Sequence, residues 1–267
     1  MAQRTVTALI GLPILIVIVS LGGPWLRFAL LLLSLLGLYE FYRALSMKIL
    51  PIHFSGFIFA ALYYFFVVGY EAHDYLLVTF SAFILLCLAI TVIQYQKITL
   101  ADCLITVSGF FYVAFLLSFI YFVRVNSVYF VWIIFISASA SDTFAYMVGR
   151  MWGRHKLSGT PSPGKTVEGC VGGVVGAALV GFVYGQLVVF FAGVTHPIVL
   201  NAMLISVVGA VFSQFGDLFA SAIKRSVGIK DFGQILPGHG GVLDRFDSII
   251  VSAPVVYMVI IGIGHMS

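Results

Sequence analysis

The chain contains nine mostly apolar stretches, each close to the length that a helix needs to cross the hydrocarbon core of a membrane, about 20 residues. These stretches lie at residues 6–22, 25–45, 54–70, 75–94, 103–123, 128–149, 169–193, 197–220 and 248–265. Only 9% of the residues are charged and 61% are hydrophobic, whereas soluble domains carry roughly 25% charged residues. The sequence therefore excludes a water-soluble fold. It predicts an all-α, polytopic membrane bundle of about nine transmembrane helices.

The polar connections between these stretches are mostly short, so we expect a single membrane domain over residues 1–267. Two connections are long, residues 150–168 and 221–247, and they hold most of the polar motifs. The spans within 1–123 carry no chemical motif, whereas 124–267 contains both long loops. We therefore expect the active site in the C-terminal part.

The basic residues predict the orientation of the chain. If the N-terminus lies in the cytoplasm, all of the 14 Lys and Arg residues except Arg27 and Arg124 fall on the cytoplasmic side. Lys and Arg concentrate in the cytoplasmic loops of membrane proteins. Both long loops are therefore expected to face the cytoplasm. Topology explains the net charge of +4, and no nucleic-acid partner is expected.

Glycines recur at four-residue spacing along the stretch 169–193. The pairs are Gly169 and Gly173, Gly172 and Gly176, and Gly181 and Gly185. Small residues at this spacing let a second helix approach closely. That helix belongs either to the same chain or to a second copy, so packing within the monomer and the seam of a homodimer are both open interpretations.

Acidic residues gather at the cytoplasmic ends of four predicted spans. They are Asp142, Glu168, Asp217, Asp244 and Asp247. Asp142 lies about seven residues before the end of its span, which is roughly 10 Å below the interface at about 1.5 Å per residue. A charge there costs about 2.5–3.5 kcal/mol on insertion scales. Asp142 is therefore expected to face a polar cavity or a cation, with a hydrogen bond to a neighbouring helix as the alternative.

Three of these aspartates form a candidate metal site. Asp244 and Asp247 are three residues apart and share one face if the last span begins near Leu243. Asp217 lies at the end of the preceding span. Mg²⁺ prefers oxygen ligands and shares its shell with substrate phosphates. Asp217, Asp244 and Asp247 are therefore predicted to bind Mg²⁺; helix capping and pairing with Arg245 are the alternative.

Cations accompany the acids in both loops. They are Lys165 in the first loop and Lys224, Arg225 and Lys230 in the second. Carboxylates with Mg²⁺ and surrounding cations suit phosphoryl or nucleotidyl transfer, in which catalysis is mostly positioning and charge neutralisation. His239 lies between two glycines; it could donate to a phosphate or transfer a proton, and its neighbours equally suit a tight turn.

The segment GTPSPGKT, residues 159–166, matches the Walker A pattern letter for letter. A P-loop follows a strand and binds phosphates with successive backbone N–H groups. Here a membrane helix is expected upstream, and Pro161 and Pro163 lack that donor. We therefore reject a P-loop. Lys165 and Thr166, just before a helix N-terminus, can still bind an anion.

Taken together, these motifs resemble the signature of phosphatidate cytidylyltransferases, also called CDP-diacylglycerol synthases. The matching segments are SAIKR at 221–225, KDFG at 230–233 and LPGHGGVLDRFD at 236–247. Two upstream blocks, DTFAY at 142–146 and SPGKTVEG at 162–169, resemble further parts of that family. The resemblance covers about the last half of the chain by motif.

The resemblance implies an enzyme that makes CDP-diacylglycerol and pyrophosphate from CTP and phosphatidic acid for phospholipid biosynthesis. Asp217, Asp244 and Asp247 would hold Mg²⁺, with a second cation such as K⁺. Phosphates would be neutralised or bound by Lys165, Thr166, Lys224, Arg225 and Lys230. Asp142 would organise the polar cavity. We expect a multi-pass protein among the lipids of the bacterial cytoplasmic (inner) membrane, with its active site facing the cytoplasm.

Two other functions fit parts of the pattern. A cation transporter would explain the buried acids, but Lys224, Arg225 and Lys165 would repel its cargo. A CDP-alcohol phosphotransferase also uses membrane aspartates and Mg²⁺, but its D-G-x-x-A-R run is missing from the sequence. Ion flux and phosphatidate-dependent CTP turnover distinguish these alternatives.

Overall fold

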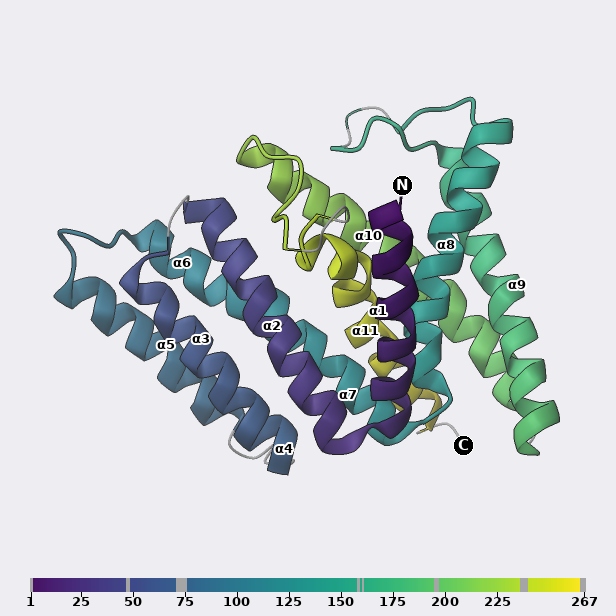
Figure 1. Cartoon of the computed structure of the whole chain (residues 1–267), viewed down its shortest axis with the longest axis horizontal. Helices are drawn as coiled ribbons and strands as arrows, with labels where there is room; N and C mark the ends of the chain where they lie inside the picture. Colours follow the sequence, from purple (N-terminus) through teal and green to yellow (C-terminus); the bar gives the residue numbers. More distant parts are fainter. Residues whose placement is uncertain are drawn as a thin grey trace. The chain divides into compact units, whose positions relative to one another are not determined.

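The computed structural model describes residues 2–46, 49–70, 76–157, 159, 161–194, 197–235 and 240–264. Within them the chain is helical (Figure 1), apart from connections and one isolated β-bridge. The helices before the first long loop are α1 (Ala2–Leu21), α2 (Gly23–Ser46), α3 (Pro51–Leu62), α4 (Val68–Tyr70), α5 (Leu76–Ile93), α6 (Leu100–Gly109), α7 (Leu116–Asn126) and α8 (Phe130–Trp152). Then follow α9 (Val167–Ala192), α10 (Pro197–Ser226) and α11 (Leu243–Gly264). Two π-helices, η1 (Tyr63–Val67) and η3 (Phe110–Phe115), join α3 to α4 and α6 to α7.

The all-α membrane fold predicted from the sequence is confirmed. Among the described residues, 7 helices are long and apolar enough to cross a membrane. Gly11–Leu21 and Ile52–Val67 are shorter apolar helices. They coincide with the first and third predicted spans, so nine is an approximate count of crossings.

The chain forms two compact units, which are described separately. Unit 1 comprises Met1–Tyr121 and Val227–Arg245, and unit 2 comprises Phe122–Ser226 and Phe246–Ser267. Most of the second long loop, residues 227–245, thus belongs to the same unit as the N-terminal helices.

The core of unit 1 is rich in tyrosine and phenylalanine around the two π-helices. The Tyr64 hydroxyl donates to the Ala114 carbonyl in η3 at 3.1 Å and accepts from the Ser34 hydroxyl of α2 at 3.0 Å. The Tyr63 and Ser118 hydroxyls are 2.9 Å apart. These bonds satisfy polar groups in a segment whose wider helical turn breaks the α-helical pattern. The Ser34–Tyr64 bond also ties α2 to this core, and the last turns of α2 lie beside the second long loop.

Unit 2 is built around α8, α9 and α10, which lie side by side in Figure 1. The glycines of α9 make this packing possible. A Cβ at Gly172 would overlap Val148 of α8, and one at Gly176 would overlap the Phe144 ring. Toward α10, a Cβ at Gly185 would lie 2.7 Å from Cα of Val199. The close helix approach predicted from the glycine spacing therefore occurs within the monomer.

Candidate active site

The loop between α8 and α9 folds back on itself as a short antiparallel pair. Lys156 and Thr166 form an isolated β-bridge, and the Leu157 N–H donates to the Lys165 carbonyl at 3.0 Å. Thr166 is the N-cap of α9, and its hydroxyl accepts the Gly169 N–H at 3.1 Å. Lys165 therefore lies directly before a helix N-terminus, as predicted. A helix, α8, precedes this loop, which agrees with the rejection of a P-loop.

Glu168 closes the base of the same loop from the first turn of α9. Its carboxylate accepts the backbone N–H groups of Arg154 and His155 at 3.2 Å. Nδ1 of His155 lies 2.5 Å from Oε1 of Glu168. An acid is also favoured electrostatically in the first turn of a helix. Glu168 therefore positions the loop that presents Lys165.

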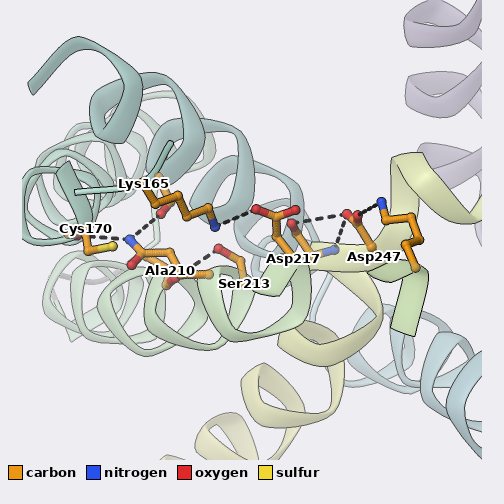
Figure 2. A network of polar contacts seen from close by, with 10 residues as sticks. Lys165, Cys170, Ala210, Ser213, Asp217 and Asp247 are labelled. Atoms are coloured by element: carbon orange, nitrogen blue, oxygen red, sulfur yellow. Dashed lines mark hydrogen bonds and ion pairs between the residues drawn. The ribbon is translucent and has the colours of Figure 1, made fainter. Parts of the chain in front are cut away.

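Lys165 and Asp217 form an ion pair between this loop and α10. Nζ of Lys165 lies 2.5 Å from Oδ2 of Asp217, and the two side chains are 25% and 31% exposed. Figure 2 shows the lysine reaching across to the aspartate. Two predicted site residues from separate parts of the sequence are thus brought into direct contact.

A cavity of about 360 Å³ lies beside Lys165. Asp142 from α8 lines it together with Arg150, Lys165, Thr166 and Gln214. This volume is within the range of small-molecule sites, about 300–1,000 Å³. The polar cavity expected at Asp142 is therefore present in unit 2, and it contains both cationic and anionic side chains.

Gln214 is a site residue that sequence reasoning missed. Its Nε2 donates to the Ser141 hydroxyl of α8 and to the Cys170 carbonyl of α9, both at 3.0 Å. The amide thereby joins α8, α9 and α10 at the cavity wall, one turn before Asp217. Its signal in the sequence was an amide side chain within a mostly apolar span, because buried polar groups require hydrogen-bond partners.

Lys224 and Asp247 form a second, longer ion pair. Nζ of Lys224 lies 4.0 Å from Oδ2 of Asp247, and the side chains are only 12% and 11% exposed. Oδ1 of Asp247 accepts the Ser248 N–H at 2.7 Å and the Ser248 hydroxyl at 3.4 Å. The two oxygens of this carboxylate thus have different partners: one faces a cation and the other is held by α11.

The helices α10 and α11 meet next to these pairs. A Cβ built on Gly216 would lie 2.6 Å from the Asp247 carbonyl oxygen and 3.1 Å from Cα of Ser248. Glycine therefore permits the backbones to touch at this position. Asp217 follows Gly216 directly, and Figure 2 shows the Asp217 and Asp247 side chains at this crossing. Unit 2 thus presents two neighbouring carboxylates, each with a lysine partner.

Asp244, the third predicted metal ligand, lies in unit 1 and closes the second long loop. Its Oδ2 accepts the Phe232 N–H at 2.8 Å and the Gly241 N–H at 3.1 Å. One oxygen of Asp244 therefore has a structural role that the sequence analysis did not assign. Helix capping was the alternative considered there, and this contact resembles it.

Unit 1 also contains Glu40, which sequence reasoning missed. This carboxylate of α2 is 1% exposed and accepts backbone N–H groups at the start of α11. It lines a second cavity, of about 700 Å³, with Arg43, Lys230 and Asp231. A lone carboxylate within an apolar stretch was its only signal. The spans without motifs therefore contribute to the polar loop that carries the signature.

Comparison with known proteins places these features in a family. A sequence model described as "Cytidylyltransferase family" matches residues 2–262. The chain belongs to the cytidylyltransferase family. It is 32% identical over 265 residues to a phosphatidate cytidylyltransferase of Staphylococcus haemolyticus, covering 98% of this chain and 99% of the relative. Its identity to the Staphylococcus epidermidis protein of the same name is 33% with the same coverage, and to that of Staphylococcus aureus 32%.

The family assignment agrees with the apolar helices of the chain. The predicted resemblance to phosphatidate cytidylyltransferases is confirmed by these relatives, which align along nearly their whole length. Apolar helices and staphylococcal relatives together indicate a multi-pass bacterial membrane enzyme. The interpretation as a cation transporter is therefore not needed to explain the acidic residues.

The carboxylates present suit Mg²⁺ only if substrate phosphates and water supply the other ligands. Within each unit, the described residues contain no group of three or more His, Cys, Asp or Glu side chains that could hold a metal. Mg²⁺ is usually bound by one or two carboxylates together with substrate phosphates and water. Asp217 and Asp247 match that requirement. The donor set therefore suits a metal that arrives with an anionic substrate.

Of three other predicted site residues, two lie within the part of the chain that the structure describes. Arg225 belongs to the last turn of α10. Lys230 lines the cavity in unit 1. His239 lies outside the described residues, so its role as a proton donor or turn residue stays a prediction.

Proposed function

We propose that this enzyme transfers the cytidylyl group of CTP to phosphatidic acid and releases pyrophosphate. The observation that supports this most directly is the Lys165–Asp217 pair beside the cavity that Asp142 lines in unit 2. The relatives named phosphatidate cytidylyltransferase support the choice of substrates. The product is CDP-diacylglycerol.

The reaction requires two anions to meet. An oxygen of the lipid phosphate attacks the α-phosphorus of CTP and forms a new P–O bond. The bond between the α-phosphorus and the bridging oxygen breaks, and pyrophosphate leaves with that electron pair. Because the lipid phosphate is itself the nucleophile, no covalent intermediate with the enzyme is needed.

Basic side chains of the two loops and of the last turn of α10 neutralise this charge. We assign phosphate binding to Lys165, Lys224, Arg225 and Lys230, with Thr166 at the N-terminus of α9. Lys165 is held by Asp217 before substrate binds, so it is already placed beside the cavity. An incoming phosphate would compete with Asp217 for the ammonium group. Such preorganised cations favour the transition state, in which charge shifts toward the leaving pyrophosphate.

Asp217, Asp247 and, from the resemblance, Asp244 would hold Mg²⁺, with K⁺ as a second cation. When bound, Mg²⁺ would neutralise the phosphate oxygens of CTP. In this arrangement Ser248 fixes one oxygen of Asp247, and Lys224 limits repulsion between the neighbouring carboxylates. Asp142 would complete the polar wall and orient water or phosphate groups near Lys165.

The expected site faces the cytoplasm. CTP is soluble in water, whereas phosphatidic acid keeps its acyl chains in the lipid and its phosphate at the interface. A polar cavity at the cytoplasmic ends of apolar helices is accessible to both. The concentration of Lys and Arg in the long loops supports this orientation.

Pyrophosphate release by the detergent-purified protein tests the proposal. CTP is supplied with or without phosphatidic acid, in Mg²⁺ or in EDTA. We expect release only when lipid and metal are both present. Release without lipid, or no release from well-folded protein in lipid, would refute the proposed reaction. Ion flux in liposomes would then test the transporter alternative.

A further inference from the structure

Glu40 is a buried carboxylate with an unusual set of partners. It lies on α2, and its side chain reaches the segment just before and at the start of α11. Oε1 accepts the Val242 N–H at 3.0 Å, and Oε2 accepts the Leu243 N–H at 2.8 Å. The partners are more than 200 positions away in the sequence. Both carboxylate oxygens are therefore used to hold the backbone of one distant segment.

Two glycines of the second loop pack directly on this carboxylate. A Cβ built on Gly233 would collide with Oε1 of Glu40. One built on Gly241 would lie 2.6 Å from Oε2 and 2.7 Å from Oε1. Neither glycine is among those with positive φ. The carboxylate itself therefore explains why no larger residue fits at these two positions.

A second carboxylate, that of Asp244, binds both ends of the same loop. Oδ2 of Asp244 accepts the N–H groups of Phe232 and Gly241. Residues 232–233 and 240–243 are thereby held together, with Glu40 and Asp244 as the two acceptors. Hydrogen bonds to charged acceptors are stronger than those between neutral groups. Loss of Glu40 would thus release the backbone that precedes Asp244.

We propose that Glu40 is a positioning residue, whose buried carboxylate fixes the two ends of the second loop and thereby sets the position of Asp244 for the transfer reaction. This inference rests on the proposed function for its catalytic part. Its structural part concerns the backbone of residues 240–243 and can be measured without any substrate. Glu40 does not touch substrate in this account and acts only through the loop.

The first test compares Glu40→Gln with the wild type. An amide side chain has one acceptor oxygen, so its NH₂ group would face one of the two backbone donors. Hydrogen–deuterium exchange in the peptide covering 240–245 should become at least about tenfold faster, because one charged hydrogen bond is lost. The kcat for pyrophosphate release should fall at least about tenfold, while KM for CTP changes less than about threefold.

Ser34→Ala provides the matched control on the same helix. It removes a buried hydrogen bond to Tyr64 inside unit 1. We expect it to lower thermal stability to a similar extent as Glu40→Gln, with loop exchange and kcat unchanged. If Ser34→Ala accelerated loop exchange and lowered kcat equally, Glu40 would be a general stabilising residue and the proposal would be wrong.

A double mutant tests the contact itself. Gly233→Ala should lower kcat in the wild-type background, because the new methyl group meets the carboxylate. In a Glu40→Ala background that obstacle is gone, so adding Gly233→Ala should lower kcat by less than about a further threefold. Equal penalties in both backgrounds would overturn the proposal. If Glu40→Ala does not fold, the comparison is made with Glu40→Ser.

The two proposals fail in different ways. Wild-type protein without phosphatidate-dependent release would refute the proposed function, and loop exchange would still test whether Glu40 holds the loop. Active wild-type protein with normal kcat and normal exchange in Glu40→Gln would refute the positioning role alone.

Discussion

Replacement of Lys165 by methionine separates a stabilising ion pair from a catalytic cation. Methionine keeps most of the length of the side chain and removes the charge. At 2.5 Å the gross attraction to Asp217 is about 7 kcal/mol with an effective dielectric constant of about 20. The side chains are 25% and 31% exposed, so screening and desolvation reduce the net contribution to about 1 kcal/mol. We therefore expect a small loss of stability.

The effect on activity should be much larger. Removing one preorganised donor from a developing charge typically costs about 2.7–4 kcal/mol, or about 10²- to 10³-fold in rate. Unfolding by SDS titration in detergent micelles measures the stability, and phosphatidate-dependent pyrophosphate release measures the activity. Lys156 is an exposed lysine of the same loop. The control variant Lys156→Met should keep both the stability and the activity of the wild type. Activity of Lys165→Met within about threefold of the wild type would refute the assignment.

Three further substitutions have defined outcomes. Asp244→Asn should abolish nearly all pyrophosphate release while the global fold persists, with faster local amide exchange in the second loop; a wild-type rate would remove it from the site. Gly176→Ala should lower the free energy of unfolding by about 1–3 kcal/mol because its methyl group meets the Phe144 ring, whereas Gly262→Ala, with no atom within 4 Å, should be neutral. Gln214→Leu should cost about 1–3 kcal/mol by leaving buried partners without their donor, and unchanged stability would show that the three helices do not depend on it.

The helices could be predicted from the sequence because the membrane requires long apolar segments. Each predicted stretch corresponds to a helical segment among the described residues, and only two fall short of the length or composition of a full span. The glycine spacing correctly predicted close helix contacts. It could not tell an internal contact from an intermolecular one, since both require the same small residues.

The pairing of charges could be predicted only in part. The sequence identified Lys165 and Asp217 as site residues, but their contact depends on a loop that folds back toward α10. Glu40 and Gln214 were missed because their partners include backbone groups far away in the sequence. A backbone amide has no residue-specific signal. Such contacts become visible only when the helices are placed in three dimensions.

The assignment of the second long loop to unit 1 also escaped prediction. Residues 227–245 are adjacent in sequence to α10 and continue into α11, yet they pack with the N-terminal helices. Sequence adjacency favours grouping a loop with its own flanking helices. Here two hydrogen bonds to Glu40 join the end of this loop to α2.

The packing of residues 227–245 with the N-terminal helices limits how the chain can be divided into fragments. A fragment comprising residues 122–267 would contain the whole family signature, including every residue proposed to bind metal or phosphate. It would nevertheless lack the helix whose carboxylate holds the start of α11. Such a fragment should insert into membranes as apolar helices without forming an ordered loop. Co-expression with residues 1–121 would be the way to restore it, because the missing partner is a buried side chain rather than a soluble cofactor.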